Sequence, residues 1–363
     1  MTHGQAIGRR EILALGAIAP FALRSPVLRA AEPDLSALQD ITGDAQPIGA
    51  QERAWRIERA QALMRANGIG AVLIEAGSSL TYFTGIKWWR SERLTAAVLP
   101  VDGEAMVVTP FFEEPSVRES LGIPANVRVW QEDEDPLKLI AGFLKERRLA
   151  DKPVGIEETV RYFAVDGLRH ALPDVSIVSA NPVVRAVRMR KTPAEIALMQ
   201  MATDVTIAAY RWTYDRVETG MSASDVSALM SGATRKLGGD VEFSMVLLNE
   251  ASAYPHGSKQ PQKVVKGGVV LMDCGCAVHG YQSDISRTFV FGEPDKKQQQ
   301  VWQTVRKGQE IAFAAAQIGK PAGSVDDAVR DHYTALGYGP DYVLPGLSHR
   351  TGHGIGMEGH ESV

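Results

Sequence analysis

The apolar positions of residues 51–180 predict short helices that alternate with short strands. Residues 51–67 place apolar side chains at helical spacing among charged ones, and Gly68 would end that helix. Two apolar runs flank the Asp102-Gly103 step, which is typical of a β-hairpin. The other expected elements are strands at 71–74, 127–130, 154–156 and 175–178 and helices at 113–121 and 136–148. The pattern therefore predicts a compact α/β domain over residues 50–180.

The composition of the chain changes after residue 180, since residues 181–190 are rich in arginine. A long helix is expected from Pro193 to about residue 217, because Thr192 can cap it and Glu195 stands at the capping-box position. A second helix should begin after Ser222 or Ser224 and end near residue 237, and strand-like segments follow up to Gly292. We therefore expect a second, mixed α and β domain over residues 181–363.

Length and composition fit this two-domain interpretation. The chain has 363 residues, and about 100–200 residues per domain is usual. Hydrophobic residues make up 45% and charged residues 23%, as in ordinary globular proteins, and the formal charge is −4. Because no basic stripe is present, the sequence argues against nucleic acid as a partner.

The N-terminus is typical of an export signal. Arg9 and Arg10 precede an apolar run over residues 12–23, and small residues follow near residue 31. The paired arginines resemble a twin-arginine signal, and a Sec-type or amphipathic leader is the alternative. We expect a signal peptide over residues 1–31, a polar linker over 32–49, and a periplasmic or secreted protein. Since no segment reaches transmembrane length, stable membrane insertion is not expected.

Two aspartates are the first candidates for chemistry. Asp273 follows a run of apolar residues, and Asp284 lies on the segment that returns after it. A turn at residues 278–280 would set the two on neighbouring strands. Close carboxylates repel each other and raise a pKa unless a cation lies between them. Cys274 and Cys276 are one residue apart in the same run, and we interpret both as small buried residues.

Three histidines near the end of the printed sequence complete the candidate site. His349, His353 and His360 lie among glycines, which permit close approach of backbone or substrate. Oxygen ligands combined with imidazoles are suited to divalent cations. The two segments together therefore predict a divalent-metal site.

These residues also carry a resemblance to a known family. Six residues match in type and spacing the pita-bread metallopeptidases, which include aminopeptidase P, prolidase and creatinase: His256, Asp273, Asp284, His349, His353 and His360. The resemblance implies an α/β protein with a creatinase-type N-terminal α/β domain, followed by a pita-bread (α+β) catalytic domain.

The resemblance also implies a role for each residue. Asp273 would bind one metal ion, Asp284 would bridge two, and His353 would bind the other. His256 and His360 would donate hydrogen bonds to the scissile carbonyl or to the tetrahedral intermediate, and His349 would line the side of the leaving group. Two divalent ions are implied, with manganese favoured and cobalt or zinc also suited to the ligands.

The implied activity is hydrolysis of the bond between an N-terminal residue and proline, in an Xaa-Pro aminopeptidase or dipeptidase. The substrate would be a peptide with proline at its second position, and the protein would form a homodimer. Trp88 and Trp89 would either cover a neighbouring subunit's cleft or form a local packing cluster. A creatinase-like hydrolase or lyase on the same fold, and a peptide-binding domain without catalysis, are the alternatives.

One departure from the family pattern concerns the metal ligands. The family completes its site with two glutamates beyond the position of His353, and the printed sequence stops at Val363. We therefore expect an incomplete pita-bread domain with little or no peptidase activity in the chain as printed, and an active peptidase in a full-length form.

Overall fold

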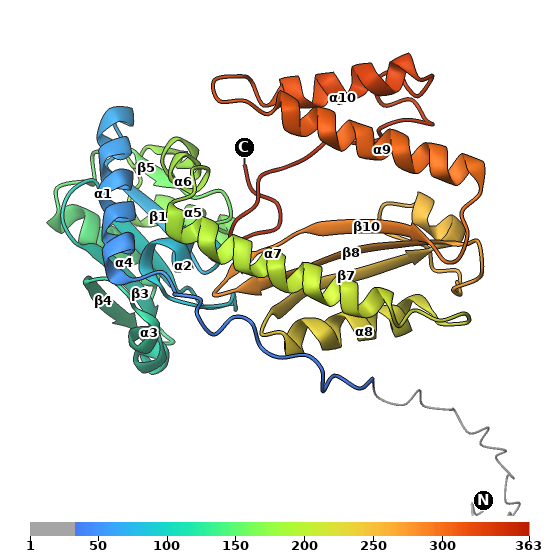
Figure 1. Cartoon of the computed structure of the whole chain (residues 1–363). Coiled ribbons are helices and arrows are strands. Elements are labelled where there is room, and N and C mark those ends of the chain that lie inside the picture. Colours follow the sequence, from blue (N-terminus) through green and yellow to red (C-terminus); the bar gives the residue numbers. More distant parts are fainter. Residues whose placement is uncertain (1–32, 363) are drawn as a thin grey trace, which may run out of the picture. The chain divides into compact units, whose positions relative to one another are not determined.

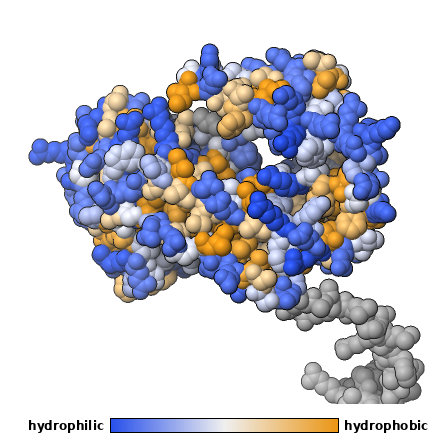
Figure 2. Space-filling model, viewed as in Figure 1, coloured by the Kyte–Doolittle hydropathy of each residue, from blue (hydrophilic) through white to orange (hydrophobic). Residues whose placement is uncertain are grey.

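The computed structural model describes residues 33–362. The expected signal peptide over residues 1–31 lies outside these residues. Leu35–Val363 forms one compact unit, in which a six-stranded sheet precedes an antiparallel sheet and its helices (Figure 1). None of the helices described between residues 33 and 362 has the length and apolar character needed to span a bilayer. On the face in Figure 2, hydrophobic residues are interspersed with hydrophilic ones.

The first sheet is mixed and has the strand order β4-β3-β2-β1-β5-β6. Its strands are β1 (Ala71–Glu75), β2 (Ala96–Pro100), β3 (Ala105–Pro110), β4 (Ala125–Trp130), β5 (Val154–Ile156) and β6 (Ile177–Ser179). β1 pairs antiparallel with β2 and parallel with β5, and β2 and β3 form the predicted hairpin. All residues of β1, β2 and β3 are buried, as expected of central strands covered on both faces.

Helices and two apolar clusters cover the faces of this sheet. The helical elements are α1 (Ala50–Asn67), α2 (Ser78–Thr84), η1 (Phe111–Glu113), α3 (Glu114–Ser120), α4 (Pro136–Glu146), α5 (Tyr162–Ala171) and α6 (Asn181–Arg188). Val72 and Ile74 belong to one cluster and Ala71 and Leu73 to the other, because alternate strand residues face opposite sides. Gly68 ends α1 in the left-handed conformation, with φ of 67°, as the sequence predicts.

Three of these helices were not anticipated from the sequence. α2 is almost entirely buried, so its residues show no polar and apolar alternation. α6 buries Val183, Val184 and Val187 among arginines, and the charge of that segment obscures its apolar face. α5 is short, and only Ala164 and Leu168 of its residues are buried. Short helices with few buried positions give a weak periodic signal.

The second sheet is antiparallel and carries the candidate chemistry. Its strands are β7 (Asp240–Leu248), β8 (Val269–Val278), β9 (Tyr281–Gln282) and β10 (Ile285–Val290), in the order β10-β8-β7 with β9 paired to β8. His279 and Gly280 form the turn between β8 and β9, with φ of 49° and 84°. The turn predicted at residues 278–280 is therefore confirmed, and it suits a two-residue hairpin connection.

Helices pack against this sheet and against one another. They are α7 (Pro193–Tyr214), α8 (Ala223–Lys236), α9 (Lys296–Ala315) and α10 (Gly323–Ala335), and the short η2 (Asn249–Ala253) follows β7. Thr192 and Glu195 form the predicted capping box of α7, and Ser222 caps α8. α7 packs on β8 and α8 on β7. α9 and α10, which pack together, were not anticipated.

The described part of the expected linker contains no helix or strand before α1. Its side chains nevertheless contact the second half of the chain. Leu35, Leu38 and Ala45 pack against the apolar cluster of α7, α8 and the second sheet, and the Ile41 N–H donates to the Leu237 carbonyl at 3.1 Å. The domain boundaries drawn from the sequence stay predictions.

Candidate metal centre

The second sheet places the two candidate aspartates close together. Asp273 lies on β8 opposite Ser286 of β10, whose hydroxyl donates to Asp273 Oδ1 at 2.7 Å. Asp284 lies between β9 and β10, one residue before β10 begins. The sequence predicted the two aspartates on neighbouring strands. Asp273 does lie on β8, but Asp284 lies just outside β10, in the connection from β9.

The environment of Asp284 disfavours its charged form. Burial is the largest cause that raises the pKa of Asp284, and repulsion by Asp273 raises it further. His353 and His360 act in the opposite direction without cancelling these effects. Two carboxylates with this relationship are stabilised when a cation lies between them.

Two of the three histidines in the glycine-rich segment join Asp284. His353 Nε2 lies 3.5 Å from Asp284 Oδ2, and the rings of His353 and His360 stack with centroids 3.9 Å apart. Asp284, His353 and His360 each offer a ligand atom, and these atoms lie within 4.8 Å of one another. The sequence assigned His360 to hydrogen bonding, whereas the geometry groups it with the possible metal ligands.

The donor set fits a divalent cation. It combines the carboxylate of Asp284 with the imidazoles of His353 and His360, while Asp273 lies on β8 outside this group of three. Such oxygen and nitrogen ligands suit manganese, cobalt and zinc. Burial and repulsion by Asp273 raise the pKa of Asp284, and positive charge beside its carboxylate would offset both effects. A bound divalent ion would supply that charge.

The loop that carries His353 and His360 closes on itself. Gly354 and Glu361 form an antiparallel bridge, with N–H···O=C distances of 3.2 and 2.8 Å. A Cβ on Gly356 would lie 2.7 Å from Glu361 Oε2, so only glycine leaves room for that carboxylate. The glycines of this segment therefore serve close packing within the loop.

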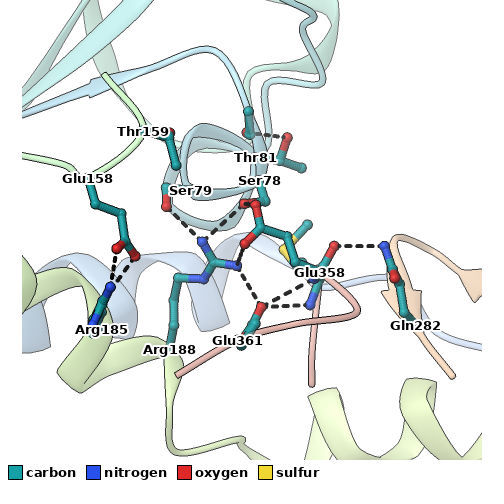
Figure 3. A network of polar contacts seen from close by, with 12 residues as sticks. Ser78, Ser79, Thr81, Glu158, Thr159, Arg185, Arg188, Gln282, Glu358 and Glu361 are labelled. Carbon is teal, nitrogen blue, oxygen red and sulfur yellow. Dashed lines mark hydrogen bonds and ion pairs between the residues drawn. The ribbon is translucent and has the colours of Figure 1, made fainter. Parts of the chain in front are cut away.

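The Glu361 carboxylate is buried and paired with two cations, of which Figure 3 shows Arg188. Arg188 Nη2 lies 2.5 Å from Oε1, and Lys191 Nζ lies 2.8 Å from Oε2. Burial alone would raise the pKa of Glu361, but Arg188 and Lys191 outweigh it and hold that pKa below its ordinary value. The carboxylate is therefore ionised at neutral pH.

A pocket of about 560 Å³ opens beside this loop. His353, His360, Arg188 and Glu361 contribute to its wall. The candidate metal ligands thus border a space large enough for a small peptide.

The structure does not bring the other two predicted histidines to the cluster. His256 is exposed after η2, and across residues 33–362 no hydrogen bond or ion pair joins it to Asp284, His353 or His360. His349 is exposed, and its ring nitrogen Nδ1 lies 2.8 Å from the Arg350 carbonyl. The catalytic roles given to His256 and His349 stay predictions.

Cys274 and Cys276 are free and buried, as expected. Burial raises the pKa of both thiols. Cys276 Sγ lies 3.3 Å from the Ala202 carbonyl. Both side chains therefore belong to the core below the site.

No local sequence pattern indicates the residues that support the loop. Arg188 and Glu361 are separated by 173 positions, and no local pattern links them. Arg188 stands in the arginine-rich segment, where nothing in the sequence distinguishes it from Arg185 or Arg190. A buried ion pair between distant segments is visible only in the folded chain.

Comparisons with known proteins agree with this arrangement. Residues 56–190 match the Creatinase/Prolidase N-terminal domain, and residues 197–363 match Metallopeptidase family M24. A probable dipeptidase PepE from Mycobacterium bovis is 30% identical over 316 residues, which cover 86% of this chain and 82% of that protein. An Xaa-Pro dipeptidase from Pyrococcus furiosus is 28% identical and covers 84% of this chain and 83% of that protein.

Solved structures give the same result. The crystal structure of dipeptidase PepE from Mycobacterium ulcerans superimposes with a TM-score of 0.79 at 29% identity, over 87% of this chain and 84% of that chain. A recombinant prolidase from Thermococcus sibiricus gives a TM-score of 0.77 at 28% identity, over 86% and 84% of the two chains. The predicted fold is confirmed, and the chain belongs to metallopeptidase family M24, with a creatinase/prolidase N-terminal domain before a pita-bread catalytic domain.

Proposed function

We propose that this peptidase hydrolyses the bond between an N-terminal residue and a proline at the second position. The observation that carries the proposal is the convergence of Asp284, His353 and His360 beside a pocket, with Asp273 on the neighbouring strand. The similarity to Xaa-Pro dipeptidase and prolidase over most of the chain supports the substrate class. A peptide N-terminus would lie in the pocket near the two imidazoles.

The chain's own residues have separate tasks in this reaction. Asp273, Asp284 and His353 would hold two divalent ions, for which manganese is our first choice, and such ions would activate water and polarise a carbonyl. His360 stacks on His353, and its imidazole N–H would donate to the carbonyl of a bound peptide and stabilise developing negative charge. His256 and His349 assist on the substrate side once a peptide is bound.

The reaction is tested with the protein isolated from the cells that make it. Alanyl-proline, alanyl-prolyl-alanine and alanyl-alanine are incubated with it and MnCl₂, and released alanine is measured. The proposal predicts release from the two proline peptides and none from alanyl-alanine. Release of alanine only from alanyl-alanine would contradict the substrate class, and peptide binding without any cleavage would favour the non-catalytic alternative. Conversion of creatine with no peptide cleavage would favour the creatinase-like alternative.

Asp284→Asn tests whether this site carries the activity, and Asp327→Asn is its matched control. The Asp284→Asn substitution keeps the shape of the side chain and removes the carboxylate that lies 3.5 Å from His353 Nε2. Loss of cleavage in Asp284→Asn, with retention in Asp327→Asn, would assign the activity to this site. Asp327 is an exposed residue of α10.

We also propose that the protein forms a homodimer. Trp88 and Trp89 stack with ring centroids 5.3 Å apart, and Trp89 is 74% exposed. Trp88 packs partly against the apolar core, and the exposed ring of Trp89 stacked on it suits a contact with a second copy. Light scattering after gel filtration should give twice the chain mass, and Trp89→Ser should shift the protein toward monomer. A monomeric wild-type protein would contradict this proposal.

Export by the twin-arginine route is the last part of the proposal. It rests on Arg9 and Arg10 before an apolar run in the sequence. Cell fractionation should find the protein in the periplasm or medium, and replacement of both arginines by lysine should retain it inside the cell. Export unchanged by that replacement would favour a Sec-type leader.

A further inference from the structure

We propose that Arg188 is a positioning residue that holds the loop of His353 and His360 in place through its ion pair with Glu361. The inference rests on the proposed metal site, and it adds a residue of α6, at the end of the N-terminal half of the chain. Arg188 does not contact the imidazoles. It acts through the backbone of residues 354–361.

Glu361 is the point at which the loop is held. Its Oε1 accepts from Arg188 Nη2 at 2.5 Å, from the Met357 N–H at 3.0 Å and from the Glu358 N–H at 3.3 Å. Lys191 Nζ contacts Oε2 at 2.8 Å. The carboxylate thus joins two cations to the middle of the loop and to its end at residue 361, and its side chain is only 6% exposed.

The bridge between Gly354 and Glu361 transmits this constraint to the histidines. Paired residues of an antiparallel bridge share one face, and their immediate neighbours share the other. Glu361 therefore extends toward Arg188 on one face, while its neighbour His360 and the Gly354 neighbour His353 lie on the opposite face. Their rings stack there, beside Asp284.

Arg188 is itself held firmly. Its Nη1 donates to the hydroxyls of Ser78 at 3.0 Å and Ser79 at 2.8 Å, both on α2 (Figure 3). Ser78 also donates to Glu358 Oε1 at 2.6 Å. The guanidinium side chain is 10% exposed. Because the buried guanidinium is bonded to α2 on one side and to Glu361 on the other, it can set the position of the loop. A mobile ion pair on the surface cannot.

The opposite end of the loop has a different support. The Gln282 N–H of β9 donates to the Gly356 carbonyl at 2.7 Å, and Gln282 Nε2 donates to the Met357 carbonyl at 3.2 Å. Loss of Arg188 should therefore displace the segment near residue 361 without releasing the whole loop. The expected result is a change at His360 and His353 in a folded protein.

The substitution Arg188→Met tests the proposal, and Arg185→Met is its matched control. Arg185 lies on the same helix, borders the same pocket and pairs with Glu158 on the surface (Figure 3). Within residues 33–362 no hydrogen bond or ion pair joins Arg185 to residues 354–361. The first readout needs no metal: the nitrogen resonances of ¹⁵N-labelled histidines in the metal-free protein. We expect Arg188→Met to shift the His353 and His360 resonances and to leave those of His170 and His332 in place. Arg185→Met should leave all four unchanged.

The second readout is the affinity for Mn²⁺ by calorimetry. Arg188→Met should weaken binding by about 10–100-fold, which is typical when a residue that orients metal ligands is lost. Arg185→Met should bind as the wild type does. If Arg188→Met does not fold, Lys191→Met replaces it, since that variant removes only the Oε2 contact and should give the same changes to a smaller degree.

The outcomes separate this inference from the proposed function. Unchanged His353 and His360 resonances in folded Arg188→Met or Lys191→Met would overturn the positioning role, whatever the affinity of the variant for Mn²⁺. A wild-type protein that binds no Mn²⁺, but whose two resonances still respond to Arg188→Met, would overturn the metal site and leave the loop support intact. Equal effects of Arg185→Met and Arg188→Met would also overturn the inference.

Discussion

The Nε2 atom of His353 lies 3.5 Å from Oδ2 of Asp284, although one residue belongs to the glycine-rich loop and the other precedes β10. The carboxylate is half-buried, and Asp273 repels it from the neighbouring strand. The ionised side chain of Asp284 therefore costs stability in the metal-free protein and serves function instead of folding.

Asp284→Asn should have opposite effects in the two states of the protein. Without metal it removes the repulsion from Asp273, so we expect a higher midpoint of thermal unfolding than in the wild type. With Mn²⁺ at 100 times its Kd, the wild type should gain about 2.7 kcal/mol and the variant should gain much less. Scanning calorimetry with and without MnCl₂ measures both effects. A variant that is less stable than the wild type without metal would contradict the account.

Gly356→Ala should disturb the loop, whereas Gly352→Ala should not. A Cβ on Gly356 would lie 2.7 Å from Glu361 Oε2, but one on Gly352 meets nothing within 4 Å. We expect Gly356→Ala to weaken Mn²⁺ binding and to lower the free energy of unfolding by about 1–3 kcal/mol. Gly352→Ala should stay within about 0.5 kcal/mol of the wild type. Urea unfolding and calorimetry measure the two effects, and equal behaviour of the two variants would be the contradicting result.

A buried ion pair links α1 to α7 and should be sensitive to the loss of one partner. Arg56 Nη2 lies 3.3 Å from Glu195 Oε1, and both side chains are 1% exposed. The Tyr281 hydroxyl donates to the same oxygen at 2.9 Å. Arg56→Met leaves a buried carboxylate without its cation, so we expect a loss of about 3–5 kcal/mol in the free energy of unfolding.

Arg65→Met is the control for that prediction. Arg65 lies on the same helix and pairs with Asp102, but the two side chains are 53% and 76% exposed. Solvent screens such a pair, and its loss should cost less than about 1 kcal/mol. Urea titrations of the two variants provide the comparison. A similar loss in both would show that burial does not determine the cost.

Asp326 should make the stability of the protein depend on pH at the acidic end. Burial acts to raise the pKa of Asp326, but hydrogen bonds from Arg330 and Thr351 outweigh it and the net pKa lies below the ordinary value of 3.8. Because the folded pKa is lower than the unfolded one, the contribution to stability is present above that value and is lost as the pH falls through the folded pKa.

The comparison of Asp326→Asn with the wild type measures this contribution. The variant should be less stable at pH 7, and the difference should narrow as the pH falls below about 4. Asp327→Asn, at an exposed neighbouring position, should show little difference at either pH. A gap between wild type and Asp326→Asn that widens toward low pH would contradict the assignment.

Local sequence patterns predicted much of this fold, because many of its caps and turns are determined by residues that are neighbours in the sequence. The Thr192 and Glu195 capping box, the Asp102-Gly103 hairpin and the turn at Gly280 each depend on residues close together in sequence. They could be assigned without knowledge of the rest of the chain. Asp273 and Asp284 were placed together for the same reason, since one short turn connects them.

Long-range relationships could not be predicted in this way. α2 is buried on nearly all sides, so no periodic pattern marked it as a helix. The pairing of Arg188 with Glu361 depends on how the two halves of the chain fold against each other. The stacking of His360 on His353 follows from the Gly354 bridge, which the sequence does not reveal.

The position of bound manganese tests the central claim most directly. Crystals of the protein soaked in MnCl₂, measured near the manganese absorption edge, locate the ion by its anomalous signal. The account predicts two peaks at Asp273, Asp284 and His353, one of them within ligand distance of both Asp284 and His353. No peak there, with manganese bound only elsewhere on the molecule, would contradict the account.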